Sequence, residues 1–287
     1  MAATTVPKIT ATTPDSTTGP TTPGRTTLGP TTPGRTTLGP TTPKPTTVPM
    51  TTGKRGPKDC YEHFEEGRTD SGKYTIYVAG LSSGLEVYCD MFYDNGGWTR
   101  FQRRITGSQR FHDRTWAEYQ SGFGDAIGDD DSEFWIGLDN LHLLTNQDDY
   151  QIRIPMVDYD GDLIYAQYDH FKISDESDNY RLDVSGYVGL SSAGDALTDS
   201  HNGMPWSTID RDNDNDTKNC AEVMRGAWWY GRCLTYNSEQ PYSSNLNGPW
   251  VSYPGYLRSD ENGITWDSWK HESVKKAQMK IKPYLAK

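Results

Sequence analysis

Residues 206–233 read WSTIDRDNDNDTKNCAEVMRGAWWYGRC, and this stretch decides how the rest of the chain is interpreted. Its aspartates, Asp210, Asp212, Asp214 and Asp216, alternate with other polar residues. Alternate side chains of an extended backbone point the same way, so these carboxylates repel each other unless a cation lies among them. Carboxylates, amides, carbonyls and water are the ligands that calcium prefers. We therefore expect a calcium-binding loop here; the alternative is an acidic turn that is simply solvated.

The spacing within this loop is not that of an EF-hand, which needs a glycine at its sixth position and a glutamate at its twelfth. Counting from Asp210 places Asn215 and Ala221 there, and counting from Asp212 does no better. The two cysteines in the stretch favour the metal interpretation nevertheless. A short disulfide loop would fix the end of the acidic segment and lower the cost of ordering it.

The chain has four cysteines, Cys60, Cys89, Cys220 and Cys233, and none forms a CxxC pair. This argues against zinc binding and thioredoxin-type chemistry. Three pairings are possible; pairing neighbours in the sequence is the simplest and implies an oxidising compartment. The chain opens MAATTVPKIT without an apolar signal core, so either the chain is a fragment or an export signal lies outside these 287 residues.

The charge of the chain is distributed unevenly. Residues 1–56 contain six Lys or Arg residues against Asp15, a net charge of +5, so the −11 of the whole chain leaves −16 on residues 57–287. A domain of that charge is a poor partner for nucleic acid or anionic membranes. No apolar run reaches the length of a membrane span.

Residues 1–56 are rich in Thr, Pro and Gly, and TTPGRTTLGP occurs twice in succession, at 21–30 and 31–40. Such a segment cannot bury enough apolar surface to offset chain entropy. Dense Thr with Pro is typical of an O-glycosylated, mucin-like stalk, and a plain disordered linker is the alternative. The expected organisation is a disordered stalk over 1–56 and a globular domain over 57–287.

Within 57–287, period-two alternation and turn residues predict mostly strands joined by long loops. Residues 134–138 should be buried, and the loop at 191–219 is long enough to be functional. Strands are expected at 72–79, 85–91, 98–104, 150–155, 164–173, 180–186 and 275–283, and short helices at 116–123 and 138–144.

A second acidic triplet, Asp158, Asp160 and Asp162, is another candidate cation site. However, Asp160-Gly161 is a hairpin signal between two predicted strands, so we interpret this triplet as a turn.

Catalytic patterns are weak. The GLSSG sequence at 80–84 matches G-x-S-x-G, but it lies between two predicted strands rather than between a strand and a helix. The six histidines are scattered and form no HExxH motif, so we expect no enzymatic activity. They are His63, His112, His142, His170, His201 and His271.

Many short motifs lie in order over 57–287, among them VYCDM at 87–91, GGWT at 96–99, FWIGL at 134–138, HNGM at 201–204, GAWWY at 226–230, NLNG at 245–248 and MKIKP at 279–283. Together they resemble the fibrinogen C-terminal domain, the module of fibrinogen chains, ficolins, tachylectins, tenascins and angiopoietins. The resemblance implies an α+β fold with a twisted, mainly antiparallel sheet, short helices and a loop-rich region for calcium and ligand.

The resemblance also implies particular bonds and ligands. It implies disulfides Cys60–Cys89 and Cys220–Cys233, in agreement with the local pairing. It implies one calcium ion, bound by the side chains of Asp212 and Asp214 and by the carbonyls of Asp216 and Lys218. The Asn215-Asp-Thr217 sequon lies inside this loop, and we expect it to be unused because a glycan there would crowd the cation.

In the family's lectins, a ligand pocket lies beside the calcium loop around a cis peptide, here Arg232–Cys233. Such a bond costs about 3–4 kcal/mol, so it would mark a functional backbone. Several pocket positions depart from the acetyl-binding pattern, and either nearby tyrosines rebuild an aromatic wall or the acetyl site is lost. The departures are Leu234, Met224, Asp260, Glu261 and Glu272, and the tyrosines are Tyr236, Tyr242, Tyr253 and Tyr256. The fibrinogen peptide pocket is also incomplete, because Met224 replaces an acid there, although Glu261 retains one.

The sequence thus predicts a secreted, calcium-dependent, lectin-like protein of innate immune pattern recognition, which binds carbohydrate or acetylated groups. The alternative is an extracellular matrix or signalling ligand that binds protein partners through surface loops. Weak single-site sugar binding would call for multivalency, whose source the sequence does not show.

Overall fold

The computed structural model describes residues 56–125, 132–233, 244–252, 263–270 and 272–285. These residues belong to one unit of the chain, residues 52–287. Except for Gly56, the predicted stalk lies outside the described residues.

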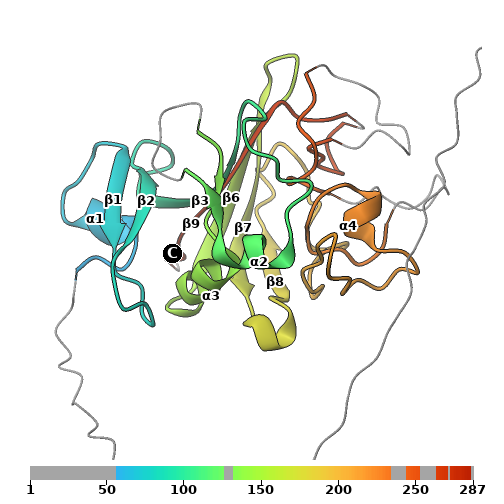
Figure 1. Ribbon diagram of the computed structural model, residues 1–287. Coiled ribbons are helices and arrows are strands. Elements are labelled where there is room, and N and C mark those ends of the chain that lie inside the picture. Colours follow the sequence, from blue (N-terminus) through green and yellow to red (C-terminus); the bar gives the residue numbers. More distant parts are fainter. Residues whose placement is uncertain (1–55, 126–131, 234–243, 253–262, 271, 286–287) are drawn as a thin grey trace, which may run out of the picture. The chain divides into compact units, whose positions relative to one another are not determined.

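An antiparallel sheet forms the centre of the domain (Figure 1). The main path runs β1-β2-β3-β9-β6-β7-β8, and the short β5 pairs with both β3 and β4. The strands are β1 (Gly72–Ile76), β2 (Leu85–Asp90), β3 (Trp98–Arg104), β4 (Phe123–Gly124), β5 (Phe134–Trp135), β6 (Tyr150–Val157), β7 (Leu163–Ile173), β8 (Leu182–Tyr187) and β9 (Lys276–Pro283).

The last strand lies in the middle of the sheet. Lys280 of β9 pairs with Arg100 of β3 on one side and with Arg153 of β6 on the other. The Lys280 ammonium is 2% exposed and lies 2.6 Å from a carboxylate oxygen of Asp90. Burial raises the pKa of Asp90, but the charge and hydrogen bond of Lys280, together with the N–H groups of Phe92 and Tyr93, bring the pKa below its ordinary value. The last strand of the domain therefore joins β3 to β6 and completes the sheet.

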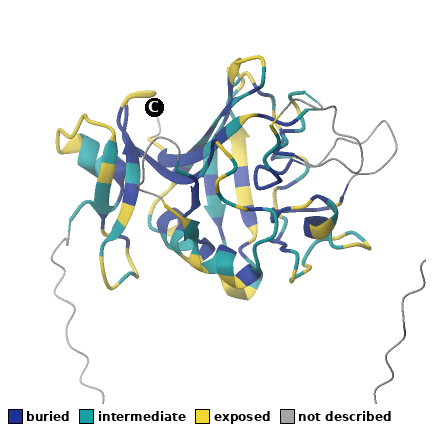
Figure 2. Cartoon of the chain, turned by 45° about the horizontal axis from the view of Figure 1, so that its top comes forward, coloured by how far each residue is buried: buried dark blue, intermediate teal, exposed yellow. Residues whose placement is uncertain are grey.

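The strands form because their side chains alternate between core and surface. In β6, every second residue from Tyr150 to Met156 is buried and the residues between are half-buried. Strand β7 repeats this pattern as far as Tyr168. One face of the central sheet thus faces the hydrophobic core, and Figure 2 shows the buried residues gathered there.

The helices are short: α1 (Cys60–Glu65), α2 (Trp116–Ser121), α3 (Leu138–Asn146), the 3₁₀ turn η1 (Glu176–Asp178) and α4 (Cys220–Val223). Helix α3 packs against β7. Helix α2 begins with a capping box, in which the Thr115 hydroxyl accepts from the Glu118 N–H and the Glu118 carboxylate accepts from the Thr115 N–H. This box satisfies backbone donors that a short helix would otherwise leave unpaired.

A buried carboxylate organises residues 105–109. Glu133, which is 1% exposed, accepts from the backbone N–H groups of Ile105 at 2.6 Å and Gln109 at 2.8 Å, and also from residues 106 and 107. Burial raises its pKa, but these N–H groups and the guanidinium of Arg104 bring the pKa below its ordinary value. This role of Glu133 was not predicted from the sequence.

Aromatic packing supports the part of the domain that carries the acidic loop. The rings of Trp206 and Trp229 meet edge to face with centroids 4.5 Å apart, and Trp228 lies 5.1 Å from Trp229. The Trp135 ring stacks against Trp206 with centroids 5.2 Å apart. All four indoles are buried. The segments on both sides of the acidic loop are therefore fixed to β5.

Most sequence-based expectations for the elements are confirmed. The seven long strands and α2 and α3 lie where they were expected, within a few residues, and Phe134–Leu138 is buried. Both disulfides pair as expected, Cys60 with Cys89 and Cys220 with Cys233. Helices α1 and α4 and strands β4 and β5 were missed. Over the described residues, no helix is both long and apolar enough to cross a membrane.

Candidate functional site: an acidic loop beside the second disulfide

The acidic loop, residues 210–218, connects the buried Trp206 to α4, on the opposite side of Figure 1 from α1. Its asparagines attach it to the core. The Asn213 backbone N–H donates to the Ser207 hydroxyl at 3.0 Å, and the Asn213 side-chain amide donates to the Trp206 carbonyl at 2.8 Å. The Asn215 N–H donates to the Gly231 carbonyl at 2.9 Å. Residues 213 and 215 thus fix the backbone, which leaves the aspartates between them for other contacts.

The first aspartate of the series is engaged elsewhere. An Asp210 carboxylate oxygen accepts from the Trp116 N–H at 2.8 Å and from the Thr208 hydroxyl at 2.7 Å. It therefore satisfies the first N–H of α2 and connects the loop to that helix. The neighbouring Arg211 stacks over the Trp116 ring with its guanidinium carbon 3.8 Å from the ring centroid.

Asp212 and Asp214 form the acidic centre of the loop. Asp214 accepts from the Cys220 N–H at 2.8 Å and from the Asp216 N–H at 2.9 Å. Burial raises the pKa of Asp214, and the nearby Asp212 carboxylate raises it further. Two acidic groups so close together are destabilising when both are charged, and a divalent cation would remove this cost.

The Asp216 side chain accepts from backbone N–H groups outside that pair. One carboxylate oxygen accepts from the Cys233 N–H at 3.0 Å and the other from the Thr217 N–H at 2.7 Å. Burial raises its pKa, but these N–H groups outweigh burial, so the pKa lies below its ordinary value. Within the described residues, no backbone N–H donates to the carbonyl of Asp216 or of Lys218.

The Lys218 carbonyl lies 3.7 Å from the Cys233 sulfur. The loop therefore offers two adjacent carboxylates and the carbonyls of Asp216 and Lys218, an all-oxygen set that fits calcium. Each Asp214 oxygen that accepts an N–H retains a lone pair for a cation. Asp216 also lies near Cys220 and Cys233, but both sulfurs are in the disulfide and cannot serve as thiolate ligands.

In the second acidic triplet, Asp158, Asp160 and Asp162, a lysine ammonium lies beside the carboxylates. The ammonium of Lys270 lies 2.7 Å from Asp158 and 2.8 Å from Asp160. The Asp158 carboxylate also accepts from the Asp162 N–H at 2.9 Å. These residues connect β6 to β7, whose pairing ends at Val157 and Leu163. The expectation of a hairpin turn here is confirmed, and the lysine neutralises its carboxylates.

The expectation of a cis peptide at Arg232–Cys233 is wrong, because no cis bond occurs in the part of the chain that the structure describes. The Cys233 N–H donates into the acidic loop, to Asp216, so it is not turned toward a ligand. The Arg232 side chain beside it is exposed.

The other predicted pocket residues are only partly visible. Met224, at the end of α4, is 3% exposed and lies in the core, where its carbonyl accepts from the Asn245 side chain at 3.0 Å. Glu272 is half-buried. The remaining positions, Leu234, Asp260, Glu261 and the tyrosines at 236, 242, 253 and 256, lie outside the described residues.

A buried histidine fixes the floor of this region. His201 is fully buried; its Nδ1 lies 2.7 Å from the Trp229 carbonyl and its Nε2 lies 3.1 Å from the Ser244 nitrogen. A carbonyl only accepts and an amide N–H only donates, so Nδ1 carries the proton and Nε2 is the acceptor. Burial lowers the pKa of His201 to about 4. The ring is therefore a neutral connector at physiological pH.

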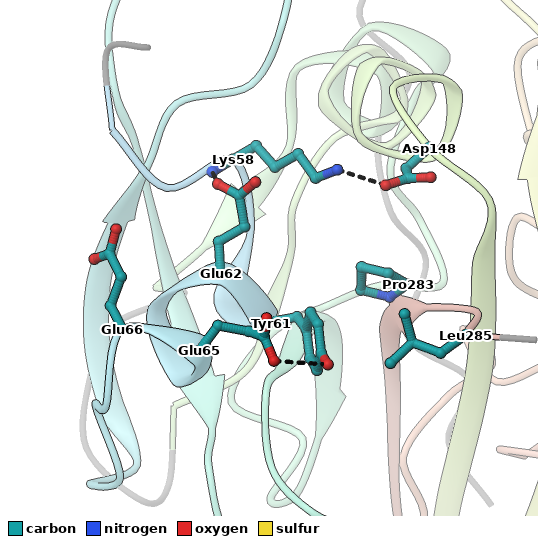
Figure 3. Close-up of a pocket in the computed structure, with 8 residues that line it drawn as sticks. All are labelled: Lys58, Tyr61, Glu62, Glu65, Glu66, Asp148, Pro283 and Leu285. Carbon is teal, nitrogen blue, oxygen red and sulfur yellow. Dashed lines mark hydrogen bonds and ion pairs between the residues drawn. The ribbon is translucent and has the colours of Figure 1, made fainter. Parts of the chain in front are cut away.

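A separate pocket of about 320 Å³ lies between α1 and the end of β9 (Figure 3). Its charged groups are largely paired. Lys58 contacts Asp148 at 2.5 Å, and its backbone N–H donates to Glu62 at 2.9 Å. The Tyr61 hydroxyl donates to Glu65 at 3.0 Å. These contacts account for most of the lining, so we do not regard this pocket as the functional site.

The comparisons with known proteins agree with this architecture. The family described as fibrinogen beta and gamma chains, C-terminal globular domain, matches residues 56–284. The chain belongs to the fibrinogen C-terminal domain family. It is 42% identical over 243 residues to fibrinogen-like protein 1 of Bos taurus, covering 80% of this chain and 73% of that protein. It is 44% identical over 232 residues to tenascin-R of Rattus norvegicus, covering 80% of this chain and 16% of that protein.

Solved structures show the same relationship. The fibrinogen-like globe domain of human ANGPTL2 matches with a TM-score of 0.70 and 36% identity, covering 80% of this chain and all of that one. Lamprey fibrin D-dimer, complexed with the peptide Gly-His-Arg-Pro-amide, matches with a TM-score of 0.71 and 34% identity, over 80% of this chain and 74% of that one.

The family relationship has limits as well as implications. Tenascins, angiopoietin-like proteins and fibrinogen are non-enzymatic ligand-binding proteins, so the expectation that this chain is not an enzyme is confirmed. Domains of this family often bind calcium. The chain spans 47% of fibrinogen C domain-containing protein 1-A of Xenopus laevis and a smaller share of tenascin-R. The activities of those whole proteins therefore do not transfer directly.

Proposed function

We propose that the domain is a secreted recognition module whose ligand region depends on calcium bound in the acidic loop. The supporting observation is the juxtaposition of the Asp212 and Asp214 carboxylates on a loop whose next aspartate is bonded to Cys233. The calcium ligands would be those two side chains and the carbonyls of Asp216 and Lys218.

Calcium would act on the ligand region through Asp216. A cation on residues 212–218 orders the backbone that carries this side chain, and the side chain holds the Cys233 N–H at 3.0 Å. Residues 232–234, together with Asp260 and Glu261, are the proposed ligand-contacting surface. Met224, the other predicted pocket residue, is buried in the core. Removing the cation should therefore weaken ligand binding, although the metal itself would not contact the ligand.

The leading ligand class is carbohydrate or acetylated groups on microbial or host surfaces, in innate immune recognition. The acidic residues proposed around the site, Asp260, Glu261 and Glu272, would favour neutral or cationic ligands over sulfated or sialylated ones. The Thr/Pro-rich residues 1–56 would display the domain on an extended, mucin-like stalk, and the two disulfides suit an extracellular location.

A protein or peptide ligand in matrix or signalling contacts is the second candidate. It is favoured by the similarity to tenascin-R and by the peptide bound to the lamprey fibrin relative. Both candidates use the same calcium-supported region, so the ligand's chemistry distinguishes them.

The test is retention of the secreted full chain on an N-acetylglucosamine resin, in calcium and then in chelator. D214N removes a proposed metal ligand, whereas D160N removes an exposed carboxylate of the lysine-neutralised turn. The lectin proposal expects calcium-dependent retention of the wild type and D160N, loss with D214N, and elution by a free N-acetylated compound. Folded wild-type protein that passes through in calcium would contradict it, and peptide binding would then support the second candidate.

A further inference from the structure

The Asn215-Asp-Thr217 sequon lies inside the acidic loop. From the sequence we expected it to be unused, because a glycan there would crowd the cation. The structure separates the two features. Asp212 and Asp214 lie close together, and Asp214 reaches toward the N-terminus of α4 through the Cys220 N–H. The Asn215 side chain instead lies against Met204, with its Nδ2 atom 3.4 Å from the sulfur. Adjacent residues of the loop thus send their side chains to different neighbours.

The acceptor residue is also accessible. Asn215 and Thr217 are both exposed. A thioether sulfur is a weak acceptor, so the contact with Met204 does not commit the Asn215 amide. An amide nitrogen has two hydrogens; a sugar bond replaces one of them and leaves the other for the sulfur or water. The backbone anchor of the loop, from the Asn215 N–H to the Gly231 carbonyl, does not involve the side chain.

We propose that Asn215 carries an N-linked glycan and that the glycan and a loop cation are present together. In the glycosylation reaction, the side-chain amide nitrogen of Asn215 attacks C1 of the sugar on a polyprenyl-diphosphate donor. The C1–N bond forms, the C1–O bond to the diphosphate breaks, and the amide proton leaves with the diphosphate through a base. The Asp at the middle position is permitted, since only proline is excluded there.

The location of the glycan has a consequence for ligand binding. Gly231, whose carbonyl accepts from the Asn215 backbone N–H, directly precedes Arg232, where the proposed ligand-contacting surface begins. A glycan on Asn215 would stand beside that surface and restrict the approach of large ligands from this side. This consequence rests on the proposed function, whereas the glycan itself does not.

The experiment uses the full chain secreted from eukaryotic cells. Peptides that contain Asn215 are examined by mass spectrometry before and after a peptide-N-glycosidase, which also distinguishes this glycan from any on the threonines of residues 1–56. The wild type and T217S, which keeps the sequon, should carry hexosamine on Asn215 and lose it with the enzyme. N215Q and T217A should carry none. An unmodified Asn215 in secreted, disulfide-bonded wild type overturns the proposal.

Coexistence with the cation is measured on the same samples. The glycosylated wild type and N215Q should show the same calcium-dependent rise in Tm. A rise in N215Q alone would overturn coexistence. If neither sample responds to calcium, the proposed metal site fails and coexistence fails with it, while the peptide masses still decide whether Asn215 is modified.

Discussion

Replacing His201 with glutamine should remove a large part of the acid sensitivity of this domain. His201 connects three segments: its own turn, the Trp229 carbonyl and the Ser244 N–H. A protonated ring would turn Nε2 into a donor that faces the Ser244 N–H, so the contact would be lost. Glutamine retains a donor and an acceptor but does not titrate.

The size of the stability loss follows from the pKa of His201 in the folded and in the unfolded chain. The folded-state pKa is about 4, and that of an unfolded histidine is about 6.5. Above pH 6.5 the ring is neutral in both states and makes no difference. As the pH falls from about 6.5 towards 4, the unfolded chain binds a proton at His201 that the folded chain does not bind. The free energy of unfolding therefore decreases. The loss is about 2 kcal/mol at pH 5 and approaches about 3 kcal/mol below pH 4.

The assay is urea unfolding of wild type, H201Q and H170Q between pH 7.5 and 4. H170Q removes a histidine that pairs with Asp183 on β7 and β8 and serves as the matched control. The wild type and H170Q should lose about 2 kcal/mol more than H201Q between pH 7 and pH 5. Equal pH slopes for all three proteins, with unchanged m-values, would refute the assignment of His201 as a buried neutral connector.

Three further substitutions test the described contacts by urea unfolding at neutral pH. K280A leaves the Asp90 carboxylate buried and unpaired and should cost about 3–5 kcal/mol, and a cost near zero would show that the pair is solvated. E133Q removes a charged acceptor from several backbone N–H groups and should cost about 2–3 kcal/mol; an unchanged midpoint would contradict the role given to this carboxylate. D210A removes the acceptor for the first N–H of α2 and should cost about 1 kcal/mol, and the account of that connection fails if D210A is as stable as the wild type.

The sequence predicted the long strands well because one face of each is buried, and this produces a period-two pattern. It did not predict which strands pair. The position of β9 between β3 and β6 depends on contacts between residues more than a hundred positions apart, such as Lys280 with Asp90 and Arg153. Local patterns contain no information on such contacts.

The missed elements are short and depend on distant partners. Helix α1 has six residues, and its N-cap Asp59 accepts both from the Glu62 N–H and from the hydroxyl of Tyr150. Helix α4 has four residues and is capped by Asn219, whose amide also donates to the Thr208 carbonyl. Over so few residues the helical period is a weak signal, and in α1 and α4 it did not indicate a helix.

At the candidate site, the resemblance distinguished the side chains of Asp212 and Asp214 from Asp216, but the hydrogen bonds of Asp210 and Asp216 were not predicted. Alternation suggested four equivalent carboxylates, whereas Asp210 bonds to α2 and Asp216 bonds to Cys233. Only Asp212 and Asp214 remain as a close acidic pair. The neutralisation of Asp158 and Asp160 by Lys270 was equally invisible, because that lysine follows more than a hundred residues later.

The most direct test of the central claim is a calcium titration of the secreted full chain, followed by Tm and by calorimetry, for wild type, D214N and D160N. We predict that the wild type and D160N bind one calcium ion and gain about 2.7 kcal/mol of stability at a concentration one hundred times Kd. D214N should show neither effect. Equal calcium binding by D214N and wild type, or no calcium binding by folded wild type, would contradict the assignment of the acidic loop as the metal site.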